Sequence, residues 1–354
     1  MNARMCIEPL SHTVEVEAGQ TLLDAALRAG VYIPHACLHG LCGTCKVQVV
    51  EGEVDIGDAS PFALMDFERD EGKCLACVAT ASCDIVIEAE IDEEPDAEMH
   101  PMQDFTGTVA KIVDLTPTAK GVYIELDGDG IDFQAGQYVN LHVPGLDQPR
   151  AFSLANAPSQ KRMIELNIRN VPGGQATGYI HNQLREGDRL RLNGPYGRFF
   201  VRRSAPEKLL FLAGGTGLSS PKSMILDLLE RGETRAITLV YGARHRAELY
   251  DDELFRDLAA RHPNFTYVPA LSAPAESDAW EGETGFVHDV ATRHFGGDFR
   301  QHKAYMCGPP VMIDACITTL IRGRLFERDM YMEKFISAAD SESTARRSPL
   351  FKAI

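Results

Sequence analysis

Four of the nine cysteines have a spacing that suits metal chemistry. They are Cys37, Cys42 and Cys45, which follow the pattern C-x4-C-x2-C, and the more distant Cys77. This is the spacing of a plant-type [2Fe–2S] cluster, in which three thiolates on one loop and a fourth on a separate segment bind two irons. Gly40 and Gly43 fall inside the loop, and without a Cβ they would let backbone amides approach the sulfurs.

A structural zinc site is the alternative interpretation of these cysteines. Zinc often binds paired C-x2-C units, and Cys74 forms such a pair with Cys77. Cys74 is also a rival to Cys77 as the fourth ligand of an iron–sulfur cluster. The four-residue spacer after Cys37 favours iron. The odd number of cysteines, with no apolar leader ahead of Cys6, argues against a disulfide scaffold and predicts a reducing, cytoplasmic location.

A second group of residues could bind a flavin. Four of them lie on a predicted strand: Arg150, Ala151, Phe152 and Ser153. Strand alternation places Arg150 and Phe152 on one side and Ser153 on the other. A guanidinium suits a pyrophosphate, an aromatic ring can stack on a flavin, and a hydroxyl can donate to the flavin N5 edge. Four more open a predicted helix, whose free amides and dipole favour phosphate: Gly174, Gln175, Ala176 and Thr177.

A third group suits a dinucleotide. Two turns follow buried strands in the last third of the chain, and they contain Gly215, Thr216, Gly217, Cys307, Gly308 and Pro309. Glycine at such a turn lets the backbone approach a dinucleotide phosphate. Pro221 fits the first position of the helix after the first turn. Ordinary strand-to-helix turns are the alternative for both segments.

The pattern of predicted elements divides the chain into parts. Residues 1–92 combine short strands with one helix and form a small α+β unit, and residues 93–103 are an acidic linker. Residues 104–203 contain regularly spaced short strands, which are typical of an antiparallel β-barrel. Residues 204–338 alternate strands with helices, which is typical of a parallel α/β sheet. Residues 339–354 are a polar tail without a pattern.

The negative charge is concentrated near the N-terminus. The 354-residue chain has a net charge of −16, and its first hundred residues hold 20 acidic side chains against 5 basic ones. Such a surface repels nucleic acid and anionic membranes and suits docking to a basic protein. An acidic face that only aids solubility is the alternative. No run of 18 apolar residues is present, which excludes a membrane-spanning helix.

The motifs, in this order, resemble the ferredoxin–NADP reductase superfamily in the form with an N-terminal ferredoxin domain. The likeness also includes Gly-Pro-Tyr-Gly at residues 194–197, and it covers roughly residues 5–337. Residues 49–57, 150–156 and 218–221 are most similar to the reductase components of multicomponent phenol hydroxylases. The resemblance implies a β-grasp ferredoxin domain, a Greek-key FAD-binding barrel and an α/β NAD(H)-binding domain over the ranges given above.

The resemblance also implies the cofactors and the partner. The cofactors are FAD, a [2Fe–2S] cluster and NADH, and the partner is the di-iron hydroxylase of a phenol or related aromatic monooxygenase. Ser153 would support flavin N5, Cys307 would line the hydride path, and Phe335 would cover the flavin ring. Phe152 stands where the family usually has tyrosine, which preserves stacking and removes a phenolic contact.

Two other functions remain open from the sequence. The reductase of a Rieske aromatic-ring dioxygenase, of the benzoate type, would share the domain order and differ in its partner. An acidic zinc-binding adaptor without redox activity would use the glycine segments only as turns. The choice between NADH and NADPH is also open, since Arg244 and Arg246 follow the second strand of the nucleotide domain, where a 2′-phosphate could bind.

Overall fold

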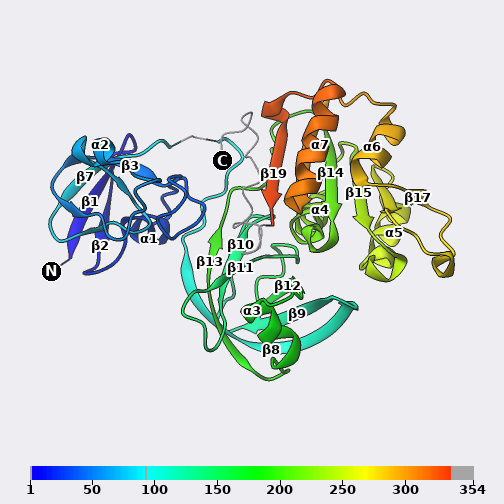
Figure 1. Ribbon diagram of the computed structural model, residues 1–354, viewed down its shortest axis with the longest axis horizontal. Helices are drawn as coiled ribbons and strands as arrows, with labels where there is room; N and C mark the ends of the chain where they lie inside the picture. Colours follow the sequence, from blue (N-terminus) through cyan, green and yellow to red (C-terminus); the bar gives the residue numbers. More distant parts are fainter. Residues whose placement is uncertain (1, 92–93, 336–354) are drawn as a thin grey trace. The chain divides into compact units, whose positions relative to one another are not determined.

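The computed structural model describes residues 2–91 and 94–335, which belong to two compact units (Figure 1). The first unit extends to Gln103 and the second begins at Asp104. The predicted polar tail, residues 339–354, lies outside the described residues. None of the helices in the described ranges has the length and apolar character needed to cross a membrane.

The first unit is a mixed sheet packed against a short helix. Its sheet has the order β2-β1-β7-β3-β5, formed by β1 (Ala3–Glu8), β2 (His12–Val16), β3 (Lys46–Glu51), β5 (Lys73–Leu75) and β7 (Ile85–Glu88). β1 and β7 run parallel, and the other neighbours are antiparallel. Helix α1 (Leu22–Arg28) begins after Thr21, whose side-chain oxygen accepts a hydrogen bond from the Asp24 amide at 3.3 Å. The predicted β-grasp α+β unit is confirmed.

Smaller elements complete the first unit. They are a two-stranded ribbon of β4 (Val54–Asp55) and β6 (Thr80–Ala81), and the short helix α2 (Asp66–Asp70). Strand β1 and helix α2 were not predicted from the sequence. The signal for β1 was present, because Ala3, Met5 and Ile7 alternate with polar residues and are buried.

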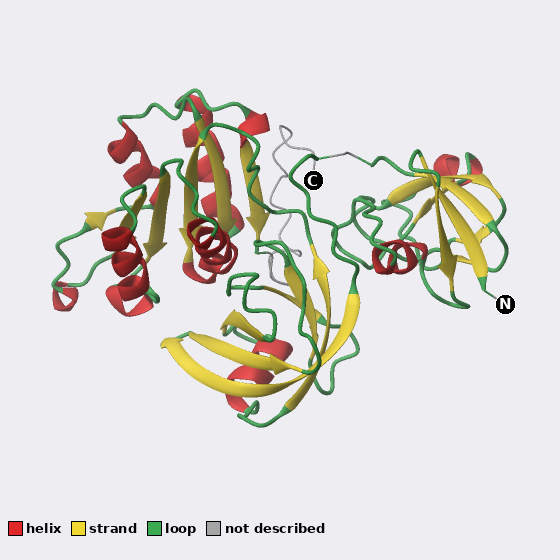
Figure 2. Cartoon of the chain, turned by 180° about the vertical axis from the view of Figure 1, so that it is seen from behind, coloured by secondary structure: helices red, strands yellow, loops and turns green. Residues whose placement is uncertain are grey.

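The second unit begins with a six-stranded antiparallel barrel. The sheet order β11-β10-β13-β8-β9-β12 is formed by β8 (Gln103–Thr116), β9 (Ala119–Leu126), β10 (Tyr138–His142), β11 (Arg150–Ser153), β12 (Met163–Arg169) and β13 (Arg189–Tyr196). A bridge between Leu154 and Leu166 links the two edges. Figure 2 shows the strands curling around helix α3 (Gln175–Asn182), whose Ala176 and Ile180 join the barrel core. The predicted barrel is confirmed.

The rest of the second unit is a parallel sheet between two layers of helices. Its order β17-β16-β15-β14-β18-β19 is formed by β14 (Lys208–Gly214), β15 (Ile237–Ala243), β16 (Phe265–Leu271), β17 (Glu283–Thr284), β18 (His302–Gly308) and β19 (Met330–Lys334). The flanking helices are α4 (Ser219–Glu230), α5 (Asp252–Arg261), α6 (Val287–Phe295) and α7 (Pro310–Arg322). The chain passes from β14 outward to β17 and then crosses to β18 on the other side of β14. Right-handed crossovers therefore place α4 and α5 on one face of the sheet and α6 and α7 on the other. The predicted parallel α/β sheet is confirmed.

One predicted helix boundary is wrong. Pro221 is the third residue of α4 and not the first. A 3₁₀ turn, Gly215–Leu218, follows β14 and leads directly into α4. Pro221 is tolerated because amides in the first helical turn have no intrahelical acceptor. Helix α6 and strand β19 were also not predicted from the sequence.

Candidate functional site

The predicted cluster ligands lie on the loop between α1 and β3 and in the turn after β5. Gly40 and Gly43 take φ values of +71° and +76°. Backbone amides in this segment face sulfur: Gly40 N–H donates to Cys77 Sγ at 3.3 Å, and Leu41 N–H donates to Cys37 Sγ at 3.4 Å. Amide donors to a thiolate stabilise its negative charge and tune the potential of a cluster bound there.

The four thiols form two pairs. Hydrogen bonding joins Cys42 to Cys37 and Cys45 to Cys77. Burial acts to raise the pKa of Cys42, but hydrogen bonds with Thr44 and Cys37 outweigh it and lower the pKa. The bond between Cys45 and Cys77 lowers the pKa of Cys45 and raises that of Cys77.

Two pairs of thiols suit two irons. In residues 2–91 and 94–335, no three His, Cys, Asp or Glu side chains gather as a site for a single ion. A structural zinc ion needs four ligands around one centre. A [2Fe–2S] cluster also needs four, and it shares them between two irons. The two thiol pairs therefore suit the two irons of such a cluster.

Cys74 has a different environment. It lies on β5, paired with Val47 of β3, and its side chain is fully buried. Burial raises the pKa of its thiol to about 12. Cys77 instead accepts the Gly40 amide and bonds with Cys45. These contacts support Cys77 as the fourth ligand.

The predicted flavin residues begin on strand β11, which pairs with β10. Arg150 and Ala151 are exposed, Phe152 is half-buried, and Ser153 is buried. The Arg150 guanidinium donates to the carbonyl oxygens of the two preceding residues at 2.9 and 3.0 Å. It lies at the surface, and its five donors suit a pyrophosphate once these loop contacts are exchanged.

Helix α3 supplies the second phosphate element. Gly174 is its N-cap, and a Cβ at this position would lie 2.7 Å from Thr177 Oγ1, which explains the glycine. Thr177 Oγ1 also accepts the Val171 N–H at 3.1 Å and ties the first turn to the preceding loop. Gln175 is exposed, whereas Ala176 packs into the barrel core. A helix N-terminus of this kind favours an anion.

The two glycine-containing turns of the parallel sheet lie in direct contact. β14 and β18 are neighbours, with Ala213 opposite Cys307. A Cβ on Gly217 would lie 2.3 Å from the Cys307 carbonyl oxygen and 2.6 Å from Gly308 Cα. The structure thus brings residues 215–217 and 307–309 together at the carboxyl ends of the strands, where dinucleotides bind in open α/β sheets.

A half-buried glutamate, Glu333 of β19, connects the predicted flavin and nicotinamide residues. Its Oε2 accepts Ser153 Oγ at 3.2 Å, Ser220 Oγ at 2.7 Å and Cys307 Sγ at 3.5 Å. Burial raises the pKa of Glu333, and the three hydrogen bonds oppose this shift. Glu333 was not among the site residues predicted from the sequence. Its only signal was its position two residues before Phe335, the residue predicted to cover the flavin.

Two further residues are candidates for contact with a cofactor. Phe335 N–H donates to the Gly308 carbonyl at 3.0 Å, and its half-buried ring packs against the core of the parallel sheet. Asn167 of β12 is buried, and neither polar atom of its side chain has a partner in the described part of the chain. Buried amides are normally satisfied, so Asn167 is a candidate for contact with a ligand.

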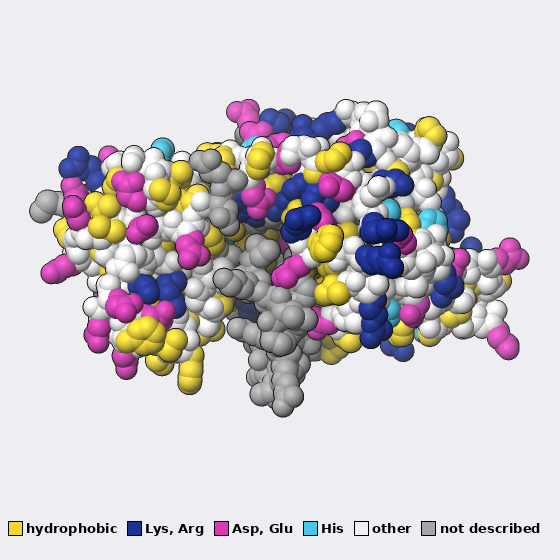
Figure 3. Space-filling view, turned by 90° about the horizontal axis from the view of Figure 1, so that it is seen from above, with side chains coloured by type: hydrophobic (Ala, Val, Ile, Leu, Met, Phe, Trp, Pro, Cys, Tyr) yellow, Lys and Arg dark blue, Asp and Glu magenta, His cyan; other side chains and the backbone are white. Residues whose placement is uncertain are grey.

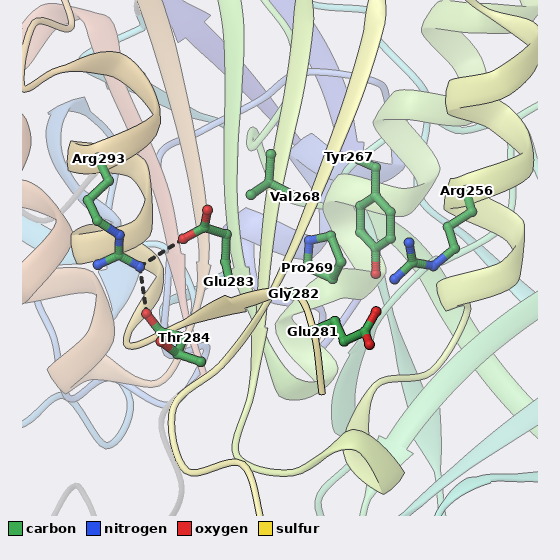
Figure 4. Close-up of a pocket in the computed structure, with 9 residues that line it drawn as sticks. All are labelled: Arg256, Tyr267, Val268, Pro269, Glu281, Gly282, Glu283, Thr284 and Arg293. Carbon is green, nitrogen blue, oxygen red and sulfur yellow. Dashed lines mark hydrogen bonds and ion pairs between the residues drawn. The ribbon is translucent and has the colours of Figure 1, made fainter. Parts of the chain in front are cut away.

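A separate pocket of about 530 Å³ opens beside β16 and β17 (Figure 4). Its two arginines already have acidic partners: Arg293 pairs with Glu283 at 2.9 Å, and Arg256 with Asp252 at 2.9 Å. The pocket shares no residue with the predicted cofactor sites. It therefore offers no free cation for a phosphate.

Family comparisons assign the three parts independently. The model of the 2Fe-2S iron-sulfur cluster binding domain matches residues 6–82. The oxidoreductase FAD-binding domain matches residues 108–201, and the oxidoreductase NAD-binding domain matches residues 211–317. The chain belongs to the ferredoxin–NADP reductase superfamily, in the group with an N-terminal ferredoxin domain. This reductase is an NADH-dependent oxidoreductase that uses FAD and a [2Fe–2S] cluster.

Curated relatives match the whole length of the reductase. It is 62% identical to the reductase component of phenol 2-monooxygenase from Pseudomonas sp. (strain CF600), over 100% of both chains. It is 56% identical to the phenol hydroxylase P5 protein of Acinetobacter pittii (strain PHEA-2), again over 100% of both chains. It is also 37% identical to an aromatic O-demethylase reductase subunit of Amycolatopsis sp., over 92% of this chain and 97% of the relative.

Solved structures share the same fold. The crystal structure of an Amycolatopsis cytochrome P450 reductase matches with a TM-score of 0.83 and 35% identity, over 94% of this chain and 98% of that chain. The ferredoxin reductase in carbazole 1,9a-dioxygenase matches with a TM-score of 0.76 and 25% identity, over 95% and 99%. These two reductases are named for a cytochrome P450 and a dioxygenase, so the fold alone does not select a partner.

A matched pair of substitutions can show whether Cys77 or Cys74 is the fourth ligand of the cluster. We expect Cys77→Ala to lose most of its iron and its iron–sulfur absorption, because one iron loses a thiolate. Cys74→Ala should keep the cluster and lower the free energy of unfolding by about 1 kcal/mol. Iron content, the visible spectrum and urea unfolding measure these effects. Cluster loss in Cys74→Ala alone would reverse the assignment.

The raised pKa of Glu333 predicts that the difference in stability between the wild type and Glu333→Gln depends on pH. Burial raises its pKa above the ordinary 4.5, so its contribution to stability is complete below pH 4.5 and is lost as pH rises through the folded-state pKa. The wild type should therefore lose stability relative to Glu333→Gln as pH increases from 4.5 towards neutrality. Urea unfolding at several pH values measures the difference, with Glu283→Gln as an exposed control. Parallel curves for wild type and Glu333→Gln would refute the effect of burial.

Proposed function

We propose that this reductase supplies electrons from NADH to the di-iron hydroxylase of a phenol or related aromatic monooxygenase. The supporting observation is its 62% and 56% identity, over full length, to reductase components of phenol-oxidising systems. The Rieske dioxygenase alternative shares the fold, as the carbazole 1,9a-dioxygenase reductase illustrates, at the lower identity of 25%. The paired thiols and the matches to cofactor-binding domains disfavour the zinc adaptor.

When bound, FAD would supply the chemistry that takes hydride from NADH, and a [2Fe–2S] cluster would supply single electrons to the partner. In this proposal Cys37, Cys42, Cys45 and Cys77 bind the irons. Arg150 and the N-terminus of α3 bind the FAD pyrophosphate. The turns at residues 215–217 and 307–309 bind NADH.

Ser153 and Glu333 form a proton-holding pair in the proposed site. Ser153 Oγ would donate to flavin N5, and Glu333 Oε2 accepts from Ser153 in the structure. Burial raises the pKa of Glu333, so its carboxyl retains a proton more readily than an exposed glutamate does. A protonated Glu333 can donate back to Ser153 Oγ, which allows a proton to move between the two side chains.

Cys307 has a positioning function in this proposal and does not act as a nucleophile. Its thiol is fully buried, and burial, with the Glu333 charge, raises its pKa well above the usual value. The thiolate needed for nucleophilic attack is therefore unfavourable. The neutral thiol donates to Glu333, and the adjoining carbonyl packs against Gly217.

The loop after β15 supports NADH rather than NADPH. Glu248 Oε2 accepts the backbone N–H of Arg244 at 3.3 Å, and Arg246 donates to the Asp278 carbonyl at 3.1 Å. A carboxylate at this position would repel a 2′-phosphate and could accept from ribose hydroxyls, as an acidic residue does in other NAD sites.

Exposed apolar side chains beside the cluster loop offer a docking surface for the partner. Leu41 lies in the loop, and Phe62, Met65 and Phe67 follow shortly after Ser60, whose amide donates to Gly40 O at 3.0 Å. Phe62 is 93% exposed. On the face seen in Figure 3, acidic and hydrophobic side chains are prominent on the first unit, at the left. An apolar centre within an acidic field suits an apolar site with a basic rim.

The acidic first unit predicts a salt-dependent coupling. Electron delivery to the hydroxylase should fall by about tenfold between 0.05 and 0.5 M salt, because screening weakens attraction between exposed charges. NADH oxidation with a neutral quinone as acceptor should change little and serves as the control. Salt-independent product formation by the complete system would reject electrostatic docking.

Phe62 should contribute to docking through its exposed ring. Phe62→Ala should raise the hydroxylase concentration needed for half-maximal coupling by about five- to tenfold, which corresponds to the loss of a moderate interface contact. Leu10→Ala, another exposed apolar residue of the first unit, is the control. Equal effects of the two substitutions on coupled product formation would show that the cluster-side surface is not the docking surface.

A further inference from the structure

A lysine ammonium is buried between the barrel and the parallel sheet. Lys222 of α4 donates to both carboxylate oxygens of Glu165, at 2.8 and 3.0 Å, and to Asp251 Oδ2 at 2.7 Å. The side chains of Lys222 and Glu165 are 6% and 8% exposed, and that of Asp251 is 18% exposed. Burial alone would lower the pKa of Lys222, but the two carboxylates raise it, so the lysine stays charged.

Glu165 connects this lysine to the segment that follows β11, the strand that carries the predicted flavin residues. Its backbone carbonyl accepts Ala155 N–H at 2.9 Å, and its backbone N–H donates to Asn156 Oδ1 at 3.0 Å. Ala155 and Asn156 follow Ser153 after one intervening residue. A second link comes from α4 itself, where Ser223 Oγ donates to the Asn156 carbonyl at 2.7 Å. The segment after β11 is thus linked to α4 in two ways: through Glu165 to Lys222, and directly through Ser223.

Asp251 connects the same lysine to the dinucleotide turn. It is the N-cap of α5, with φ of +56°, and directly follows Tyr250. Tyr250 OH donates to the Gly215 carbonyl at 3.4 Å, within the turn that precedes α4. One ammonium therefore joins β12, α4 and the segment that contacts the turn at residues 215–217.

We propose that Lys222 is a positioning residue for hydride transfer. The network of Lys222, Glu165 and Asp251 fixes the flavin strand relative to the dinucleotide turn, and so sets the approach of the two cofactors. This inference rests on the proposed function. Direct contacts hold the network at well-defined distances, and a displacement of about 1 Å at a reacting centre can cost about 100-fold in rate.

A matched control is available in the same domain. Lys303 Nζ donates to Asp329 Oδ1 at 2.8 Å, and both side chains are largely buried. This pair joins β18 to the turn before β19 and does not involve the barrel. Lys303→Met therefore tests the loss of a buried ion pair without a change at the interface between barrel and sheet.

Hydrogen exchange tests whether the network of Lys222, Glu165 and Asp251 fixes the segment after β11, without relying on activity. Full-length protein with bound cofactors would be compared as wild type, Lys222→Met and Lys303→Met by mass spectrometry. A triple variant, K222M/E165Q/D251N, removes the network without leaving an unpaired charge and serves where Lys222→Met does not fold. We expect faster exchange in the peptide over residues 150–157 when the network is removed, and wild-type exchange there in Lys303→Met.

Stopped-flow reduction of the bound flavin by NADH tests the consequence for the reaction. At a temperature where all variants are folded, loss of the network should slow hydride transfer at saturating NADH by at least about tenfold. Lys303→Met should transfer hydride at the wild-type rate. Unchanged hydride transfer in the folded triple variant would overturn the proposal, whether or not exchange increases. A wild type whose flavin NADH does not reduce would instead refute the proposed function.

Discussion

A half-buried carboxylate, shared by the two proposed cofactor sites, is the contact on which the proposed chemistry depends. Hydride passes only between groups in direct contact, yet the flavin residues lie in a barrel and the nicotinamide residues in a separate parallel sheet. Glu333 accepts hydrogen bonds from the hydroxyls of Ser153 of β11 and Ser220 of α4. It also accepts one from the thiol of Cys307. Because the site is buried, these bonds have little competition from water, and each constrains the position of the next.

Electron transfer to a partner imposes the opposite requirement, since the cluster must lie near a surface. The first unit meets it with a loop whose amides face the sulfurs and whose Leu41 side chain is exposed. The acidic charge is concentrated in the same part of the chain. Long-range attraction can therefore orient a basic partner towards the cluster before short-range apolar contacts form.

The fold classes and the cysteine loop were predictable because their signals are local. Spacing alone identifies Cys37, Cys42 and Cys45, and alternation or strand–helix order identifies the barrel and the parallel sheet. Glu333 and Lys222 were not predictable, because a glutamate in a strand and a lysine in a helix usually face solvent. Their importance comes from contacts with residues 180 and 57 positions away along the chain, which no periodicity records.

Stability does not explain why these charges are buried. Moving an ion out of water costs several kcal/mol even after relaxation, and apolar side chains of similar volume often stabilise a protein as well or better. The pKa of Glu333 is raised by this cost, and Lys222 overcomes it only with two carboxylates. Apolar packing would satisfy the fold, but it would leave the two halves of the site free to adjust by small sliding movements. Directional bonds to fixed acceptors restrict such sliding, and this restriction is a reason for charges to occupy the junction between the two proposed cofactor sites.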